Sequence, residues 1–80
     1  MAHHQYYVVL HDDQWKVTYD GKRYGPYDTQ REAYSDAVEA AKHEGSKGHQ
    51  AQVFIQGGDN EFRVEWTYGR DPYPPPGLSK

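Results

Sequence analysis

Apolar and polar residues alternate in two stretches of the chain, residues 6–19 and 51–66, as they do in strands that bury one face. In the first stretch, Asp12-Asp13 predicts a two-residue hairpin turn, which fixes the pairing of the flanking strands. The apolar residues then oppose one another on one face: Tyr6 with Tyr19, Val8 with Val17, and Leu10 with Trp15. A shift of one residue would expose them all, so this register is favoured.

The second stretch predicts another hairpin with the same segregation of side chains. A turn at Gly58-Asp59, in which glycine supplies a positive φ, again opposes apolar residues on one face: Ala51 with Trp66, Val53 with Val64, and Ile55 with Phe62. In this register the opposite face carries Phe54 directly across from Arg63. Both hairpins are therefore expected to bury one face and to leave the other polar or partly apolar.

One amphipathic helix is predicted between the hairpins. Thr29 can cap its first free amides and Glu32 can reach back reciprocally, whereas Gly45 is expected to end the helix in a left-handed conformation. At about 100° per residue, the apolar side chains form one arc: Ala33, Tyr34, Ala37, Val38, Ala40 and Ala41. Alanine at the centre of this arc allows close approach to the sheet and leaves Trp15 and Trp66 to fill the remaining volume.

A third, short strand is predicted before the helix. Asp20-Gly21 can turn the chain back through Arg23 and Tyr24, and Gly25-Pro26 is expected to end the pairing because proline has no N–H group. The predicted order is β-β-(β)-α-β-β. This is an α+β fold, in which a small antiparallel sheet of two hairpins carries one helix on one face.

The uncovered face of the hairpins is the candidate binding face. It is expected to carry Tyr7, Lys16, Phe54 and Arg63. Aromatic side chains beside cations can stack the bases of single-stranded nucleic acid. The same residues also fit a cross-strand cation–π pair that needs no ligand. A third interpretation is that a second copy of the chain, or its own residues 68–76, covers this partly apolar face.

The length of the chain, 80 residues, fits a single domain at 1–80, with an ordered core at about 5–68 and a proline-rich C-terminal tail at 69–80. Prolines at four of the last nine positions fix φ and favour an extended, polyproline-like tail: Pro72, Pro74, Pro75 and Pro76. We expect a loosely packed end, although Tyr73 beside these prolines also suits an aromatic-lined groove on a partner.

Composition narrows the classes of function. A net charge of -3 argues against dominant, nonspecific attraction to nucleic acid, although a local patch can escape that argument. The lack of cysteine excludes disulfides, thiolate metal sites and a cysteine nucleophile. The N-terminus lacks the features of a signal peptide and no apolar run could span a bilayer, so the sequence predicts a cytoplasmic protein without a membrane partner.

Neither catalysis nor a metal site is predicted. No nucleophile is visible beside a base, and one helix on a sheet is expected to offer little concavity. The five histidines lack the short helical spacing of zinc motifs: His3, His4, His11, His43 and His49. We therefore expect no enzyme activity, no cofactor and no specific metal ion.

Three segments together resemble a known family. They are Tyr7-Val8-Val9 with Trp15, the helix from Thr29-Gln30 to Ala41, and above all the closing motif Thr67-Tyr68-Gly69-Arg70-Asp71-Pro72. In these segments the chain resembles the domain of unknown function 2188 family of small bacterial proteins. It departs from the family pattern in its Gly57-Gly58-Asp59-Asn60 turn and in its longer proline run. The resemblance implies a compact α+β domain without established activity and assigns no binding or catalytic residues.

The sequence thus predicts a small noncatalytic protein-interaction module, with self-association as one form of that function. Binding of single-stranded nucleic acid through the open sheet face is the alternative. The closing motif at residues 67–72 is a further candidate, serving either folding or recognition.

Overall fold

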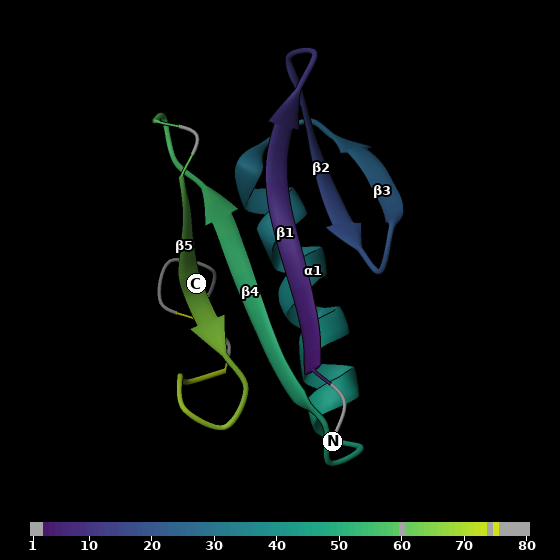
Figure 1. Ribbon diagram of the computed structural model, residues 1–80, viewed down its shortest axis with the longest axis vertical. Helices are drawn as coiled ribbons and strands as arrows, with labels where there is room; N and C mark the ends of the chain where they lie inside the picture. Colours follow the sequence, from purple (N-terminus) through teal and green to yellow (C-terminus); the bar gives the residue numbers. More distant parts are fainter. Residues whose placement is uncertain (1–2, 60, 74, 76–80) are drawn as a thin grey trace.

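Five strands and one helix make up the described part of the chain, which in this computed structural model comprises residues 3–59, 61–73 and 75. The elements are β1 (His3–His11), β2 (Gln14–Tyr19), β3 (Lys22–Tyr27), α1 (Gln30–Gly45), β4 (Gln50–Gln56) and β5 (Phe62–Thr67). The strands form one sheet in the order β3-β2-β1-β4-β5, and α1 lies across one face of it (Figure 1). The α+β layout predicted from the sequence is confirmed.

The sheet is mixed rather than wholly antiparallel, which corrects the predicted arrangement. Its central strand, β1, runs parallel to the neighbouring strand β4, with Tyr7 facing Phe54 and Val8 facing Ile55. The other neighbouring pairs are antiparallel. Parallel strands need a long crossover connection, which α1 supplies as it passes over the sheet. Alternation within each hairpin could not reveal how the hairpins join.

The first hairpin has the predicted register. Asp12 and Asp13 both adopt positive φ, 54° and 62°, as the two central residues of a type I′ turn do. Val8 then faces Val17, and Leu10 faces Trp15. The rings of Tyr6 and Tyr19 stack with their centroids 4.3 Å apart, so this pair also shares the helix-covered face, here called the inner face.

The loop of the second hairpin is longer than predicted. Gln56 pairs with Phe62, so residues 57–61 form the connection instead of a two-residue Gly58-Asp59 turn. The Glu61 N–H donates to Asp59 Oδ1 at 3.1 Å, which is the local side-chain bonding that stabilises such loops. This change moves the register of β5 by one residue from the predicted one.

A bulge at Glu65 then shifts the pairing of β5 once more. Val53 faces Trp66, whereas Phe54 faces Val64. The extra residue returns Trp66 to the inner face, where it is 1% exposed. Val64 and Phe62 instead lie on the opposite, outer face of the sheet, so their predicted place in the core is wrong.

Strand β3 continues past the Gly25-Pro26 step that was expected to end it. Tyr24 faces Val17, and after an irregularity in the pairing Tyr27 faces Trp15. Because β3 is an edge strand, proline's missing N–H removes no bond from the centre of the sheet.

Helix α1 begins as predicted but ends differently. Thr29 Oγ1 accepts a hydrogen bond from the Glu32 N–H at 3.1 Å, and Glu32 Oε1 accepts one from the Asp28 N–H at 3.2 Å. Gly45 is still helical, however, and the capping residue is Ser46, with an ordinary φ of -66°. A Cβ at position 45 would overlap the ring of Tyr68. Glycine is therefore needed here for close approach and not for a left-handed turn.

The core lies between the inner face and the apolar arc of α1. Its buried members are Tyr6, Val8, Val17, Ala33, Tyr34, Ala37, Val38, Ala41, Ala51, Val53, Ile55 and Trp66, and Trp15 packs half-buried against them. Small alanines on the helix and a large Trp66 on the sheet fill this layer together, as the sequence predicted. Among the described residues, no helix is long and apolar enough to cross a membrane.

Candidate functional site

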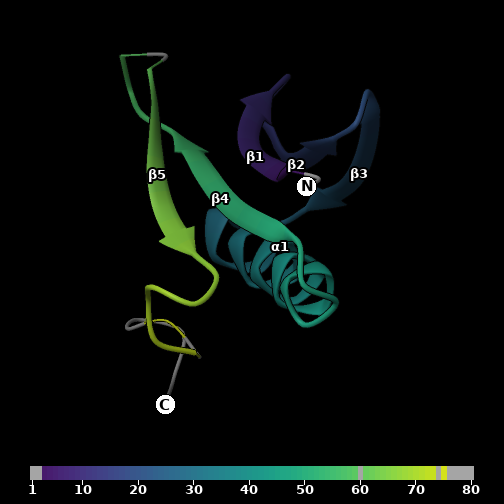
Figure 2. The ribbon, with the colours of Figure 1, turned by 60° about the horizontal axis from the view of Figure 1, so that its bottom comes forward.

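The outer face of the sheet is the side away from α1 (Figure 2). Ring contacts show that aromatic side chains gather on this face. Tyr7 and Phe54 occupy paired positions on β1 and β4, and their rings stack with centroids 4.8 Å apart. Phe62 on β5 meets Tyr7 edge-on at 5.2 Å. Val9 and Val64 lie on the same face by strand alternation. These five residues are called the outer patch.

Two cations flank the outer patch on the β2–β3 side. Lys16 pairs with Val9, and Arg23 pairs with Thr18, so both project outward. Neither Asp nor Glu occupies a paired strand position on the outer face, in the part of the chain that the structure describes. The outer face is thus locally basic in a chain whose net charge is negative.

Arg63 does not belong to this face, which corrects the predicted candidate set. It pairs with Ile55, an inner-face residue, and lines a hollow that also includes Trp15. Its guanidinium lies 3.9 Å from Glu65 Oε1, an exposed ion pair of small energetic value. The structure therefore brings together Tyr7, Lys16 and Phe54 of the predicted set and separates Arg63 from them.

The closing motif makes its contacts within the chain. The Thr67 N–H donates to Asp71 Oδ2 at 2.8 Å, and the Asp71 N–H donates back to the Thr67 carbonyl at 3.0 Å. Gly69 supplies the positive φ of 85° that this tight turn requires. Arg70 also donates its N–H to the Thr67 carbonyl, at 3.2 Å. The motif folds into a self-bonded turn.

The same motif connects β5 to the core. The indole N–H of Trp66 donates to the Pro72 carbonyl at 2.8 Å, which satisfies the one polar atom of the buried tryptophan. Tyr68 donates its N–H to the Ala51 carbonyl at 3.0 Å, and its ring lies against Gly45. These contacts attach the closing motif to Trp66, β4 and α1.

The tail does not cover the outer patch in its described part. The hydroxyl of Tyr73 hydrogen-bonds Glu39 on α1, and Lys42 Nζ lies 4.3 Å from the centre of the Tyr73 ring. The chain after β5 thus turns toward the helix side of the molecule (Figure 2). Residues 74 and 76–80 of the predicted polyproline-like tail lie outside the described residues.

A cavity of about 510 Å³ opens between α1 and the β2–β3 hairpin. Tyrosines and carboxylates share its wall: Tyr6, Tyr19, Tyr24, Tyr27, Asp36, Glu39 and Glu44. The sequence predicted little concavity, so this cavity is a correction. It exists because the small side chains of Ala37 and Ala40 on the helix leave space opposite the tyrosines. Such a wall favours a cationic occupant, because both ring faces and carboxylates attract positive charge.

Buried and half-buried tyrosines around the helix are held in their neutral form. Burial, followed by the charges of Glu65 and Asp71, raises the pKa of Tyr34 to about 12. Burial, followed by a hydrogen bond and the charge of Asp36, raises the pKa of Tyr27 to about 12. Burial and the charge of Glu44 also raise the pKa of Tyr19, so its hydroxyl keeps its proton at neutral pH.

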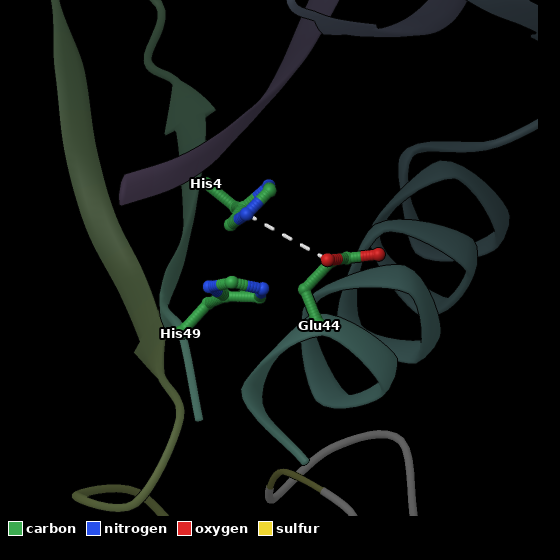
Figure 3. Close-up of side chains that lie close together, drawn as sticks. All are labelled: His4, Glu44 and His49. Carbon is green, nitrogen blue, oxygen red and sulfur yellow. Dashed lines mark ion pairs between the residues drawn. The ribbon is translucent and has the colours of Figure 1, made fainter. Parts of the chain in front are cut away.

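Two histidines and a glutamate converge where β1 begins, α1 ends and β4 begins (Figure 3). The nearest ligand atoms of His4, Glu44 and His49 all lie within 4.8 Å of one another. His4 Nε2 is 3.6 Å from Glu44 Oε1, and the two imidazole rings lie 4.9 Å apart. His3, by contrast, is exposed. The spacing of the histidines along the sequence did not indicate this cluster. His4 and His49 come together because β1 and β4 are parallel, which places the starts of the two strands side by side.

Glu44 is ionised at neutral pH. Partial burial opposes its ionisation, but the hydrogen bond and charge of Lys47, together with the charges of His4 and His43, outweigh burial and hold the pKa of Glu44 below its usual range. The Lys47 Nζ lies 3.4 Å from Glu44 Oε2, which leaves Oε1 directed toward His4 (Figure 3).

Comparison with known proteins places this fold in a family. The family described as uncharacterized proteins conserved in bacteria, DUF2188, matches residues 6–68, from β1 through β5 to Tyr68. No curated protein and no solved structure matches the chain. The matched segment contains the outer patch, the cavity wall and two members of the histidine–glutamate cluster, Glu44 and His49. The chain therefore belongs to the DUF2188 family of bacterial proteins.

Proposed function

We propose that this chain is a noncatalytic interaction module that pairs with a second copy of itself through the outer face of the sheet. The outer patch carries this proposal: Phe62 and Val64 are 44% and 48% exposed on a face that the described residues do not cover. Removal of apolar surface from water is a favourable contribution to protein association. An apolar cluster on an uncovered sheet face, with polar neighbours, is a suitable interface core.

The strand order makes the outer face complementary to itself. Aromatic residues occupy β1, β4 and β5, whereas Lys16 and Arg23 lie on β2 and β3 at the other side of β1. A twofold axis parallel to β1 therefore brings the cationic half of one copy over the aromatic half of the other. Cations over aromatic rings are attracted by the ring quadrupole, so this orientation is favoured over one that opposes like halves.

The arrangement of the rings favours a protein partner over a nucleic-acid base. Tyr7 and Phe54 already use one ring face each against the other, and Phe62 meets the edge of Tyr7. Base stacking requires a free, accessible ring face. Against a protein surface, in contrast, a self-packed aromatic cluster contributes area without rearrangement.

The experiment is sedimentation velocity on the full chain over a concentration series, with a pair of matched variants. Phe62→Lys introduces a charge on the outer face, whereas Tyr24→Lys does so at a residue of similar exposure, 46%, on the inner side of β3. The wild-type sedimentation coefficient should rise with concentration toward that of a dimer. Phe62→Lys should remain a monomer, and Tyr24→Lys should behave as the wild type. A monomeric wild type at all concentrations would overturn the proposal.

Single-stranded nucleic acid is the second candidate, and the local charge of the outer face favours it. Lys16 and Arg23 flank aromatic rings on a face whose paired positions carry no carboxylate. In a titration with an oligothymidine, affinity should then fall steeply with salt, and Phe54→Ala should weaken binding by roughly 1–3 kcal/mol. Binding that is insensitive to salt, or that Phe54→Ala leaves unchanged, would eliminate this candidate.

A further inference from the structure

The histidine–glutamate cluster lies on the helix side of the molecule, separate from the outer patch. His4 comes from the start of β1, Glu44 from the last turn of α1, and His49 from the residue before β4 (Figure 3). The three side chains point toward one another from three different elements. A group bound among them would therefore contact the sheet, the helix and the connection between them at once.

One ring nitrogen in the cluster has no partner. His4 Nε2 is buried and makes no hydrogen bond, and Glu44 Oε1 at 3.6 Å is too distant to supply one. If Nε2 carries the proton, a buried donor is unpaired; if it carries the lone pair, that lone pair faces a carboxylate. A metal ion bound to the Nε2 lone pair would displace any proton on Nε2 to solvent and would balance the charge of the carboxylate, so it would remove the cost of either state.

The other ring nitrogen of His4 already has a hydrogen-bond partner. Its Nδ1 is hydrogen-bonded to the hydroxyl of Tyr19, and the two rings stack at 5.5 Å. When Nδ1–H donates to the tyrosine oxygen, Nε2 is left with the lone pair directed at Glu44. An imidazole that is oriented through its second nitrogen is the usual arrangement of a metal-binding histidine.

From this geometry we propose that His4, Glu44 and His49 form a binding site for a divalent transition-metal ion, with zinc as the best match. Two imidazoles and one carboxylate are a known zinc ligand set, and a water molecule can occupy the fourth tetrahedral position. Zinc–ligand bonds of about 2.0–2.2 Å at tetrahedral angles place ligand atoms about 3.3–3.6 Å apart. The ligand atoms here lie within 4.8 Å, so small side-chain rotations close the site.

A metal ion at this position would join the C-terminal end of α1 to the starts of β1 and β4. Its binding free energy would add to the stability of the fold, because His4 is distant in sequence from Glu44 and His49 and meets them only in the native state. This structural role is independent of the outer patch and of any partner bound there.

The test is isothermal titration of the full chain with zinc chloride at pH 7.5 in a buffer that does not chelate zinc. One zinc ion should bind per chain. His4→Gln, Glu44→Gln and His49→Gln should each lower the affinity at least tenfold, and Tyr19→Phe, which removes only the hydroxyl that orients His4, should lower it by roughly tenfold. The exposed histidines provide matched controls, so His3→Gln and His43→Gln should bind zinc as the wild type does.

Nitrogen-15 chemical shifts of the histidine rings give a second measurement that does not depend on variants. Zinc should shift Nε2 of His4 and one ring nitrogen of His49, and should leave the ring of His43 unchanged. Absence of zinc binding by the wild type would overturn the proposal. Loss of binding in His3→Gln with retention in His49→Gln would also overturn it, because the zinc would then be captured at the exposed start of β1.

Discussion

The two faces of the sheet hold their aromatic side chains in different ways. On the inner face, Trp66 is 1% exposed, packed under α1, and its indole N–H is bonded to the Pro72 carbonyl. On the outer face, Tyr7 and Phe54 stack mainly on each other, and Phe62 stays 44% exposed. The inner rings are therefore fixed by the fold, whereas the outer rings could be changed without loss of the core. Stability should depend on the inner face and association on the outer one.

The largest effect is expected when the inner face is broken. Trp66→Ala should lower the free energy of unfolding by about 3–5 kcal/mol, because it removes the largest fully buried side chain and leaves a cavity. Urea denaturation followed by circular dichroism measures the change. Phe62→Ala is the matched aromatic truncation on the outer face and should cost less than about 1 kcal/mol. Equal losses for the two variants would contradict the proposed difference between the faces.

A somewhat smaller effect is expected at the contact of α1 with the closing motif. Gly45→Ala should destabilise the chain by up to about 3 kcal/mol, because the new Cβ overlaps the Tyr68 ring. Tyr68→Ala in the same chain should recover most of that loss. A double-mutant cycle from urea midpoints measures this coupling. Additive effects of the two substitutions would show that the clash is relieved elsewhere.

The buried tyrosines predict a loss of stability at alkaline pH. Burial raises the pKa of Tyr34 from 10.0 to about 12 in the folded chain, so the unfolded state releases its proton first as the pH rises. The contribution is present below pH 10 and is lost between pH 10 and about 12, by on the order of 2 kcal/mol.

The alkaline loss can be assigned with two phenylalanine variants. Tyr34→Phe should flatten the fall in the urea midpoint over this pH range but not abolish it, because burial also raises the pKa of Tyr27 to about 12. Tyr27→Phe should flatten part of the remaining fall, because it removes the second of these raised pKa values. An identical profile for Tyr34→Phe and the wild type would refute the assignment to Tyr34.

The smallest effect on stability is expected on the outer face. Val64→Lys should change the free energy of unfolding by less than about 0.5 kcal/mol, since the side chain is 48% exposed. Leu10→Lys, at 47% exposure on the inner side of β1, is the matched control and should be similarly mild. The two should differ in association, which only Val64→Lys should abolish. Loss of association in both variants would argue against a specific outer interface.

The sequence was sufficient where the structure is determined locally. The register of β1 with β2 follows from a two-residue turn at Asp12-Asp13, and the start of α1 follows from the Thr29 cap. Both depend on residues within a few positions of one another. The register of β5 depended on a loop of five residues and on a bulge at Glu65, which alternation alone could not indicate.

The candidate site was predictable only in part, for a related reason. Tyr7, Lys16 and Phe54 were assigned correctly to one face, because strand alternation fixes the side on which they lie. Arg63 was assigned to the wrong face through the shifted register of β5. The proximity of His4 and His49 required knowledge that β1 and β4 are parallel, which is a long-range property of the fold.

The parallel pairing of β1 with β4 also has a consequence for synthesis on the ribosome. The second edge of β1 can pair only after β4 has been synthesised, because Val8 on β1 pairs with Ile55 on β4. At about 5–20 residues per second, the nascent N-terminal half exposes a bare central strand edge for roughly two to nine seconds. During that interval the edge can pair with other chains, so slower translation or a crowded polysome should increase the demand for chaperones that shield nascent strands.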